Sequence, residues 1–384
     1  MVCPVLRCGL VFLLCAGSFL RVSAQSQLLD SAFLSKKKLY TSIHEALKEP
    51  EKVYRLALVD EYLDELPSRI SELSSLQYLD VSQNKLTALP TDICDLPNLQ
   101  YIKARNNQIE RLPEGIERLQ NLVDLDLSIN LIAELPPEIK ALKKLKRLNL
   151  QKNRLKTLPE EFGDLQKLEE CNLSLNRLTE LPKRFSLCTQ LVDLDCSENK
   201  LTLLDDNFTQ LSKLQVLELT NNKLTALPEK LGSLFQLRRL LLSYNKIVTI
   251  PPTISSLKKL QVLRLEFNAL VSLPTELGSV VYLQELYLNG NHLKEFPGIL
   301  CNLRSLKILQ LSGNAIPALP DNINECVNLQ SLHLARNIIS ALPQTISKLT
   351  NLRELLIAGN PITQNTKTID TWRETLANTT VVWR

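Results

Sequence analysis

Cysteine and histidine are the residues of this chain best suited to metal binding or nucleophilic chemistry, and their spacing fits neither role. The 384 residues include nine cysteines and three histidines. They contain no C-x-x-C or H-E-x-x-H pattern, which would gather metal ligands. The chain also lacks G-x-S-x-G and the glycine-rich loops that cradle phosphate. The sequence therefore predicts a protein that is not an enzyme and has no metal or cofactor site.

Charged and aromatic side chains instead recur at fixed distances before regularly spaced asparagines. Side chains two residues apart on a short strand point to the same face, so stacked turns would bring them together in columns. One group, here called the acidic strip, consists of Asp124, Asp126, Glu170, Asp193, Asp195 and Glu218. A second group, the aromatic–arginine patch, consists of Arg239, Leu241, Tyr244, Val262, Arg264, Phe267, Tyr287 and Ile308. Aromatic and arginine residues are typical of interface hot spots, so the aromatic–arginine patch is predicted to be the principal contact with a partner. The acidic strip is a second candidate contact, and its carboxylates could instead serve to keep a long open sheet soluble.

The element that must position these side chains is a repeat of 23 residues. Asparagine recurs at this interval from Asn84 to Asn360, thirteen times without insertion or deletion. Around each one stands the frame L-x-x-L-x-L-x-x-N-x-L. Such a period predicts a coil with one short strand per turn, the strands lying side by side in a parallel sheet.

Each position of the frame has a physical reason. Ordering 23 residues costs about 35 kcal/mol at roughly 1.5 kcal/mol per residue, more than the apolar side chains of one turn can supply. Stability must therefore come from burial between turns. The asparagine amide carries donors and acceptors for backbone groups that would otherwise be buried unpaired. Leu-Pro after most asparagines predicts the end of the strand and a short helical or irregular return arc. One turn has Leu204-Asp205 instead.

The pattern divides the chain into four parts. Residues 1–24 are predicted to be a signal peptide, and 25–52 an N-terminal segment with a capping helix at 40–47. Residues 53–362 form the solenoid, with thirteen regular turns and one degenerate first turn that has Glu61 in the asparagine position. Residues 363–384 are a C-terminal cap with a helix and an edge strand. Atypical end segments are expected because an open stack exposes apolar faces at both ends.

The N-terminus has the layout of a secretory leader. An apolar run at 9–20 precedes Val22-Ser23-Ala24, which favours cleavage after Ala24. An uncleaved apolar N-terminus is the alternative. The run is too short to span a bilayer, for which about 20 residues are needed, and no other stretch predicts a membrane span. The formal charge is +4, too balanced for a nucleic-acid partner.

Six cysteines remain after the leader, and most occupy core positions of the repeat. Cys171, Cys188 and Cys196 fall in adjoining turns, so a disulfide among them is left open. Sequons at Asn172, Asn207 and Asn378 would matter only in a host that glycosylates secreted proteins.

The frame resembles that of the leucine-rich repeat superfamily over most of the chain. The 23-residue form is similar to secreted bacterial repeat proteins and to intracellular scaffolds of Ras signalling. The leader and the entry segment at 43–56 favour the bacterial relatives. The resemblance implies an α/β solenoid, a horseshoe with a concave parallel sheet and an irregular or short-helical convex side. It also implies that the concave face binds protein.

These observations predict a secreted, periplasmic or cell-surface binding module. Its concave face would recognise a protein or a cell-surface polymer. The alternative is a cytosolic signalling scaffold. The ligand, the source organism and the oligomeric state are left open.

Overall fold

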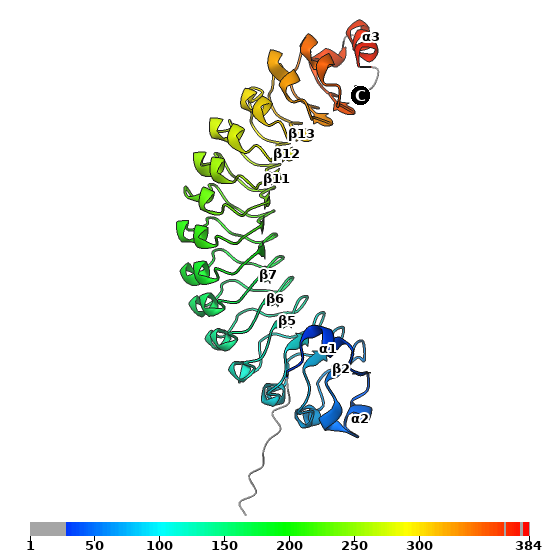
Figure 1. Cartoon of the computed structure of the whole chain (residues 1–384), viewed down its shortest axis with the longest axis vertical. Coiled ribbons are helices and arrows are strands. Elements are labelled where there is room, and N and C mark those ends of the chain that lie inside the picture. Colours follow the sequence, from blue (N-terminus) through cyan, green and yellow to red (C-terminus); the bar gives the residue numbers. More distant parts are fainter. Residues whose placement is uncertain (1–27, 365, 377–378, 384) are drawn as a thin grey trace, which may run out of the picture.

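The chain winds into a long, curved stack of turns (Figure 1). The structure is a computed structural model that describes residues 28–364, 366–376 and 379–383. The predicted signal peptide at 1–24 and the sequon residue Asn378 lie outside the described residues. Strands line the inner side of the curve and short helices line the outer side (Figure 1), so the predicted solenoid with a concave sheet is confirmed.

One parallel sheet runs through the described part of the chain, with sixteen strands in chain order. The strands are β1 (Leu39–Tyr40), β2 (Arg55–Ala57), β3 (Tyr78–Asp80), β4 (Tyr101–Lys103), β5 (Asp124–Asp126), β6 (Arg147–Asn149), β7 (Glu170–Asn172), β8 (Asp193–Asp195), β9 (Val216–Glu218), β10 (Arg239–Leu241), β11 (Val262–Arg264), β12 (Glu285–Tyr287), β13 (Ile308–Gln310), β14 (Ser331–His333), β15 (Glu354–Leu356) and β16 (Thr380–Val382). From β2 to β15, each residue pairs with the residue 23 places later, as Arg239 does with Val262. The predicted columns are therefore confirmed.

Short 3-10 helices form most of the convex side. They are η1 (Pro50–Lys52), η2 (Ser68–Glu72), η3 (Thr91–Asp95), η4 (Ile116–Arg118), η5 (Pro137–Ala141), η6 (Glu160–Asp164), η7 (Lys183–Leu187), η8 (Asp206–Gln210), η9 (Leu231–Ser233), η10 (Pro252–Ser256), η11 (Thr275–Ser279), η12 (Gly298–Asn302), η13 (Asp321–Glu325), η14 (Gln344–Lys348) and η15 (Pro361–Gln364). A proline precedes most of them. In the turn that lacks it, the Asp205 carboxylate accepts from the Asn207 N–H at 2.8 Å and caps η8. The helix therefore keeps its place in the repeat.

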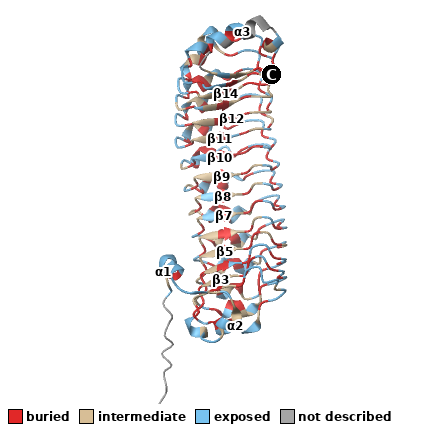
Figure 2. Cartoon of the chain, turned by 90° about the vertical axis from the view of Figure 1, so that its right-hand side faces the viewer, coloured by how far each residue is buried: buried red, intermediate tan, exposed pale blue. Residues whose placement is uncertain are grey.

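Buried residues recur along the stack (Figure 2). Leucines fill the space between sheet and helices, and asparagine amides close the polar edge of this core. Asn153 shows the pattern. Its Nδ2 donates to the carbonyls of Leu127 at 2.9 Å and Leu150 at 3.0 Å, and its Oδ1 accepts from the Ile132 N–H at 3.0 Å. Each asparagine thus ties its own turn to the preceding one. This confirms the expected role of the amide.

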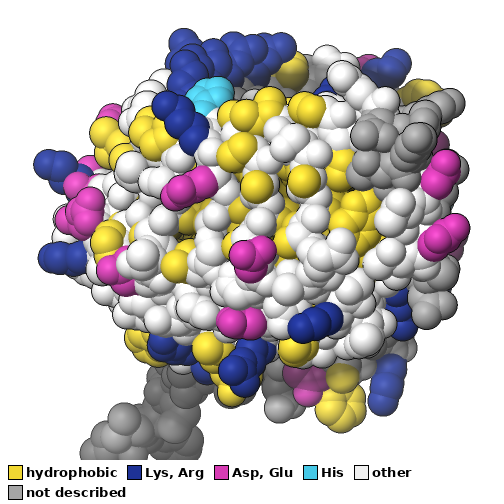
Figure 3. Space-filling model, turned by 90° about the horizontal axis from the view of Figure 1, so that it is seen from above, with side chains coloured by type: hydrophobic (Ala, Val, Ile, Leu, Met, Phe, Trp, Pro, Cys, Tyr) yellow, Lys and Arg dark blue, Asp and Glu magenta, His cyan; other side chains and the backbone are white. Residues whose placement is uncertain are grey.

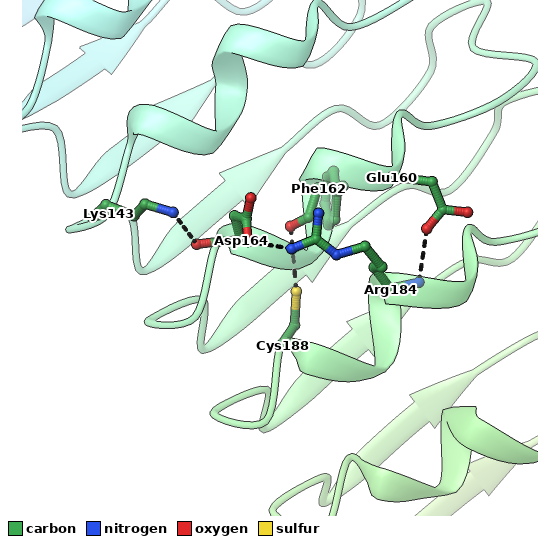
Figure 4. Close-up of polar contacts among 6 residues, drawn as sticks. All are labelled: Lys143, Glu160, Phe162, Asp164, Arg184 and Cys188. Carbon is green, nitrogen blue, oxygen red and sulfur yellow. Dashed lines mark hydrogen bonds and ion pairs between the residues drawn. The ribbon is translucent and has the colours of Figure 1, made fainter.

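Polar contacts also join neighbouring turns on the convex side (Figure 4). The Arg184 guanidinium lies 2.7 Å from the Asp164 carboxylate, and its backbone N–H donates to Glu160 at 2.9 Å. The helices approach so closely that a Cβ on Gly163 would lie 2.0 Å from the Arg184 carbonyl oxygen. The position therefore requires glycine. Deeper inside, the rings of Phe162 and Phe185 stack with centroids 5.3 Å apart.

The N-terminal segment is more structured than the sequence predicted. Helix α1 (Ser31–Ser35) and strand β1 precede helix α2 (Ile43–Ala46). Helix α2 is the predicted short helix, with Ser42 as its N-cap. Placing Tyr40 in that helix was wrong, because its backbone pairs with Leu56 and extends the sheet by one strand.

The C-terminal end has the expected elements. Helix α3 (Thr366–Thr375) is followed by β16, which pairs with β15. The side chains of Trp372, Leu376 and Trp383 are each only 6% exposed. They cover the last turn, as predicted.

A candidate partner-binding face

The strand residues of both predicted groups lie on the concave sheet, and adjacent strands carry neighbouring members. Arg239 of β10 stands between Val216 and Val262, and Leu241 stands between Glu218 and Arg264. The concave surface thus changes from the acidic strip to the aromatic–arginine patch between the adjacent strands β9 and β10. Arg239 lies at the boundary between the acidic strip and the aromatic–arginine patch.

The acidic strip lines a shallow depression of about 500 Å³ on the concave face. Arg147 forms an ion pair with Asp124 at 2.8 Å. Among the described residues, Glu170, Asp193, Asp195 and Glu218 have no such ion pair. Partial burial raises the pKa of Asp193, and the nearby Glu170 and Asp195 raise it further. The pKa of Glu218 is raised by burial and by Asp195. The free protein therefore carries carboxylates that repel one another, which a cationic group would relieve.

The most exposed part of the aromatic–arginine patch is the pair Tyr244 and Phe267, at the rim where the chain leaves the strand. Their rings stack with centroids 4.6 Å apart, and the residues are 53% and 49% exposed. Both have left-handed backbones, with φ of 58° and 55°. The next turn has Gly290 in this position, where a Cβ would lie 2.6 Å from the Phe267 ring. The glycine leaves room for the stack.

Two predicted members of the patch are more covered than their concave position suggested. Leu241 is 6% exposed and Tyr287 is 9% exposed. The Arg264 guanidinium lies over the Tyr287 ring at 4.4 Å from its centroid, and the Tyr287 hydroxyl donates to Glu285 at 2.9 Å. The long arginine side chain between the two residues explains how an outward-pointing tyrosine can be covered. Arg239 and Arg264 are exposed, while Val262 and Ile308 are half-buried.

A serine, a histidine and a glutamate meet on the concave face near its C-terminal end. The Nε2 atom of His333 lies 3.0 Å from the Ser331 hydroxyl and 2.9 Å from the Glu354 carboxylate. A proton relay needs the acid and the nucleophile on different ring nitrogens. Here both partners meet the same nitrogen. Their hydrogen bonds lower the pKa of Glu354, and the cluster reads as a polar contact between strands.

All six cysteines in the described residues are buried free thiols, so Cys171, Cys188 and Cys196 form no disulfide here. Sequence reasoning missed another neighbouring pair. The Cys326 thiol donates to the Leu300 carbonyl at 3.8 Å and shares a hydrogen bond with Cys301 that raises its own pKa. The sequence signal for this pair was the separation of Cys301 and Cys326, which is one repeat plus two residues. The Cys326 thiol on the return arc reaches past its aligned position in the preceding turn and so meets Cys301.

The two described sequons differ in their surroundings. On the concave strand β7, the Asn172 side chain accepts from the Ser174 N–H at 2.9 Å and hydroxyl at 2.6 Å. Asn207 is exposed on the convex helix η8. A glycan on Asn207 would leave the concave face open.

No group of histidine, cysteine, aspartate and glutamate in the described residues is arranged to hold a metal ion. No helix in this part of the chain has the length and apolar character needed to cross a membrane.

Several solved structures share the fold. A leucine-rich repeat protein of Leptospira interrogans is 32% identical, with a TM-score of 0.73 over 90% of this chain and 100% of that one. The ectodomain of the Arabidopsis thaliana membrane receptor kinase GASSHO1/SCHENGEN3 is 27% identical, with a TM-score of 0.57 over 84% of this chain and 46% of that one. An internalin of Listeria monocytogenes is 22% identical, with a TM-score of 0.67 over 87% of both chains, and shows the fold alone.

Family profiles match most of the solenoid. The profile described as a leucine-rich repeat region matches residues 53–126. The profile described as leucine rich repeat matches residues 120–178, 143–201, 189–247, 235–293, 258–316 and 304–362. No curated protein gives a match. The family profile covers more than half of the sequence, and the chain belongs to the leucine-rich repeat family.

Proposed function

We propose that this protein is a non-enzymatic binding module that recognises a protein, or a cell-surface polymer, with its concave face. The observation that carries the proposal is the exposed Tyr244–Phe267 stack beside two exposed arginines, Arg239 and Arg264. Aromatic and arginine side chains dominate the binding energy of protein interfaces. Two stacked rings left half exposed form a contiguous apolar surface of the kind that a partner covers.

The adjoining acidic strip adds a second requirement for the ligand. Arg147 pairs with Asp124, but Glu170, Asp193, Asp195 and Glu218 have no ion pair among the described residues. The pKa values of Asp193 and Glu218 stay raised although Arg239 lies near enough to lower both. A partner that places a basic segment over these carboxylates would relieve their mutual repulsion. The same contacts would fix the orientation of the partner. The complex of GASSHO1/SCHENGEN3 with CASPARIAN STRIP INTEGRITY FACTOR 2 supports ligand binding by this fold. We expect a partner with an apolar anchor and neighbouring cations.

The test compares two pairs of aromatic residues with similar exposure. Tyr244→Ala with Phe267→Ala removes the rim stack. Phe235→Ala with Tyr282→Ala removes rings that are 49% and 61% exposed on the other side of the turn. Full-length wild type and both variants are immobilised and offered solubilised surface and secreted proteins of the source organism. Captured proteins are quantified by mass spectrometry.

The proposal predicts a protein captured by wild type and by the Phe235/Tyr282 variant, and lost by the Tyr244/Phe267 variant. Equal capture by both variants would place the contact elsewhere. Each truncation at a hot spot is expected to cost about 2 kcal/mol, or roughly 30-fold in affinity.

We place the protein outside the cytosol, in the extracellular space, the periplasm or at the cell surface. The layout of residues 1–24 and the similarity to bacterial repeat proteins support this location. A cytosolic signalling scaffold is the second candidate function, and the free thiols of all six described cysteines favour it. Intact mass of the protein from a secretion-competent host separates the two. A chain that begins at Gln25 supports export, whereas a chain with Met1 retained in the cytosol supports the scaffold.

A further inference from the structure

A column of cations that belong to neither group on the concave sheet runs along the stack. In five consecutive turns the residue directly after the repeat asparagine is basic. The members, here called the basic ladder, are Arg154, Arg177, Lys200, Lys223 and Lys246. All five are exposed. None has an ion-pair or side-chain hydrogen-bond partner among the described residues.

The backbone holds this column in register. The Arg177 N–H donates to the Leu155 carbonyl of the preceding turn at 2.8 Å, and the Lys200 N–H donates to Leu178 at 2.8 Å. The same bond recurs at every member of the ladder. Neighbouring cations are therefore one turn apart, about 4.8 Å by the spacing of paired strands. Viewed along the stack from its C-terminal end, Lys and Arg side chains lie at several places around the edge of the molecule, with a group at the upper edge (Figure 3).

A row of hydroxyl groups lies beside the cations. In the three central turns of the ladder, the residue two places after the cation is an exposed threonine. These residues are Thr179, Thr202 and Thr225. The residue between each cation and threonine is a buried leucine, so both neighbours point outward. The Thr202 N–H reaches the Thr179 carbonyl at 3.4 Å, which keeps this row in step too. The surface thus offers parallel rows of fixed charge and of hydrogen-bonding hydroxyls.

We propose that the basic ladder binds a linear anionic polysaccharide that lies along the axis of the solenoid. A sugar chain with about one carboxylate or sulfate per ring presents anions at a pitch close to that of the turns, and its ring hydroxyls meet the threonine row. A single-stranded nucleic acid would instead need a series of aromatic side chains for base stacking. The ladder and the row beside it contain no aromatic residue. The exposed Tyr244–Phe267 stack adjoins only the last member of the ladder, since Tyr244 precedes Lys246 by two residues.

The test uses two triple variants with the same change in net charge. Arg177→Glu, Lys200→Glu and Lys223→Glu reverse the centre of the ladder. Lys140→Glu, Lys167→Glu and Lys230→Glu reverse three exposed lysines away from it. Binding of a size-fractionated heparin oligosaccharide to the full chain is measured by calorimetry at several salt concentrations. An oligo(dT) of equal charge is the second probe. Thermal melts verify that each protein is folded.

Wild type should bind the heparin oligosaccharide, with log K falling linearly as log salt rises. The ladder variant should lose roughly tenfold or more in affinity, while the control triple stays within about twofold. Absence of binding by wild type, or equal loss in both variants, overturns the site. Binding of oligo(dT) as tightly as heparin, with the same loss, overturns the choice of polysaccharide. If the ladder triple is unfolded, Lys200→Gln with Lys223→Gln replaces it.

Discussion

At the scale of single residues, the concave face holds charges in an arrangement that favours binding over stability. Asp193 lies near Glu170 and Asp195, and none of the three has an ion-pair partner among the described residues. Their repulsion is a cost of the free protein that a cationic ligand removes. Under the proposed function, the residues that weaken the free molecule would also help to select its partner.

Asp193→Asn should stabilise the protein at neutral pH. Because the pKa of Asp193 is raised in the folded state, its ionisation disfavours folding once the pH exceeds the unfolded pKa of about 3.9. The penalty is absent below that pH and complete above the folded pKa. After screening by solvent we expect a gain of ~0.5 kcal/mol at pH 7 and none at pH 3. Urea melts at both pH values measure it. A loss of stability at pH 7 would contradict this electrostatic account.

Cys94, Cys171 and Cys188 should react slowly in the native protein. Burial raises the pKa of Cys94 to about 11 and of Cys188 to about 12, and it also raises the pKa of Cys171. At pH 8 few of these thiols are ionised, and the thiolate is the reactive form. Ellman's reagent should therefore react much faster in denaturant than in buffer. Rapid reaction of these thiols without denaturant would show that the convex side opens.

At the scale of elements, the asparagine column joins each turn to the one before. The amide of Asn153 bonds carbonyls of two turns and accepts one buried N–H. Three-residue strands such as β6 would be marginal without such links, because so short a strand forms few ladder bonds.

Asn153→Ala should destabilise the solenoid strongly. The substitution leaves a buried N–H and buried carbonyls without partners, at about 1–3 kcal/mol for each unsatisfied group. We expect a loss of roughly 3 kcal/mol in urea melts. Gln166→Ala, at an exposed position outside the core, is the matched control and should change stability by less than about 0.5 kcal/mol. A small effect of the asparagine change would mean that water replaces the amide.

The periodic elements could be predicted from sequence, while the irregular ones could not. Strand positions and columns follow from the 23-residue repeat because every turn must bury the same apolar positions and pair the same backbone groups. Helix α1 and strand β1 break the repeat and depend on tertiary contacts, such as the Arg55 guanidinium donating to the Ser35 carbonyl at 2.8 Å. The burial of Tyr287 likewise depends on the conformation of Arg264, which alternation of side chains does not specify.

At the scale of the whole molecule, stability is a sum of contacts between neighbouring turns. The stability of the curved stack in Figure 1 therefore depends on the end segments that cover its first and last turns. Between them, one protein presents two distinct surfaces, the concave face and the basic ladder. Both surfaces are built from the same repeating turns, so neither needs a separate domain.

Removal of residues 363–384 should lower stability and solubility together. It exposes the last turn, which Trp372, Leu376 and Trp383 now cover, at ~1.5–3 kcal/mol for each large side chain that loses its burial. Urea melts and light scattering of the truncated and full chains measure the effect. A truncated chain that stays monomeric with an unchanged melt would show that the cap is dispensable.

The most direct test of the account is a map of which face touches a partner in the living source cell. A photo-crosslinking amino acid is placed at Val262 on the concave sheet or, in separate chains, at Gln166 on the outside. If the concave face binds a partner, a light-dependent adduct with another protein is expected from position 262 and none from position 166. Tyr244→Ala with Phe267→Ala should abolish the adduct. Adducts from position 166 alone would contradict recognition by the concave face.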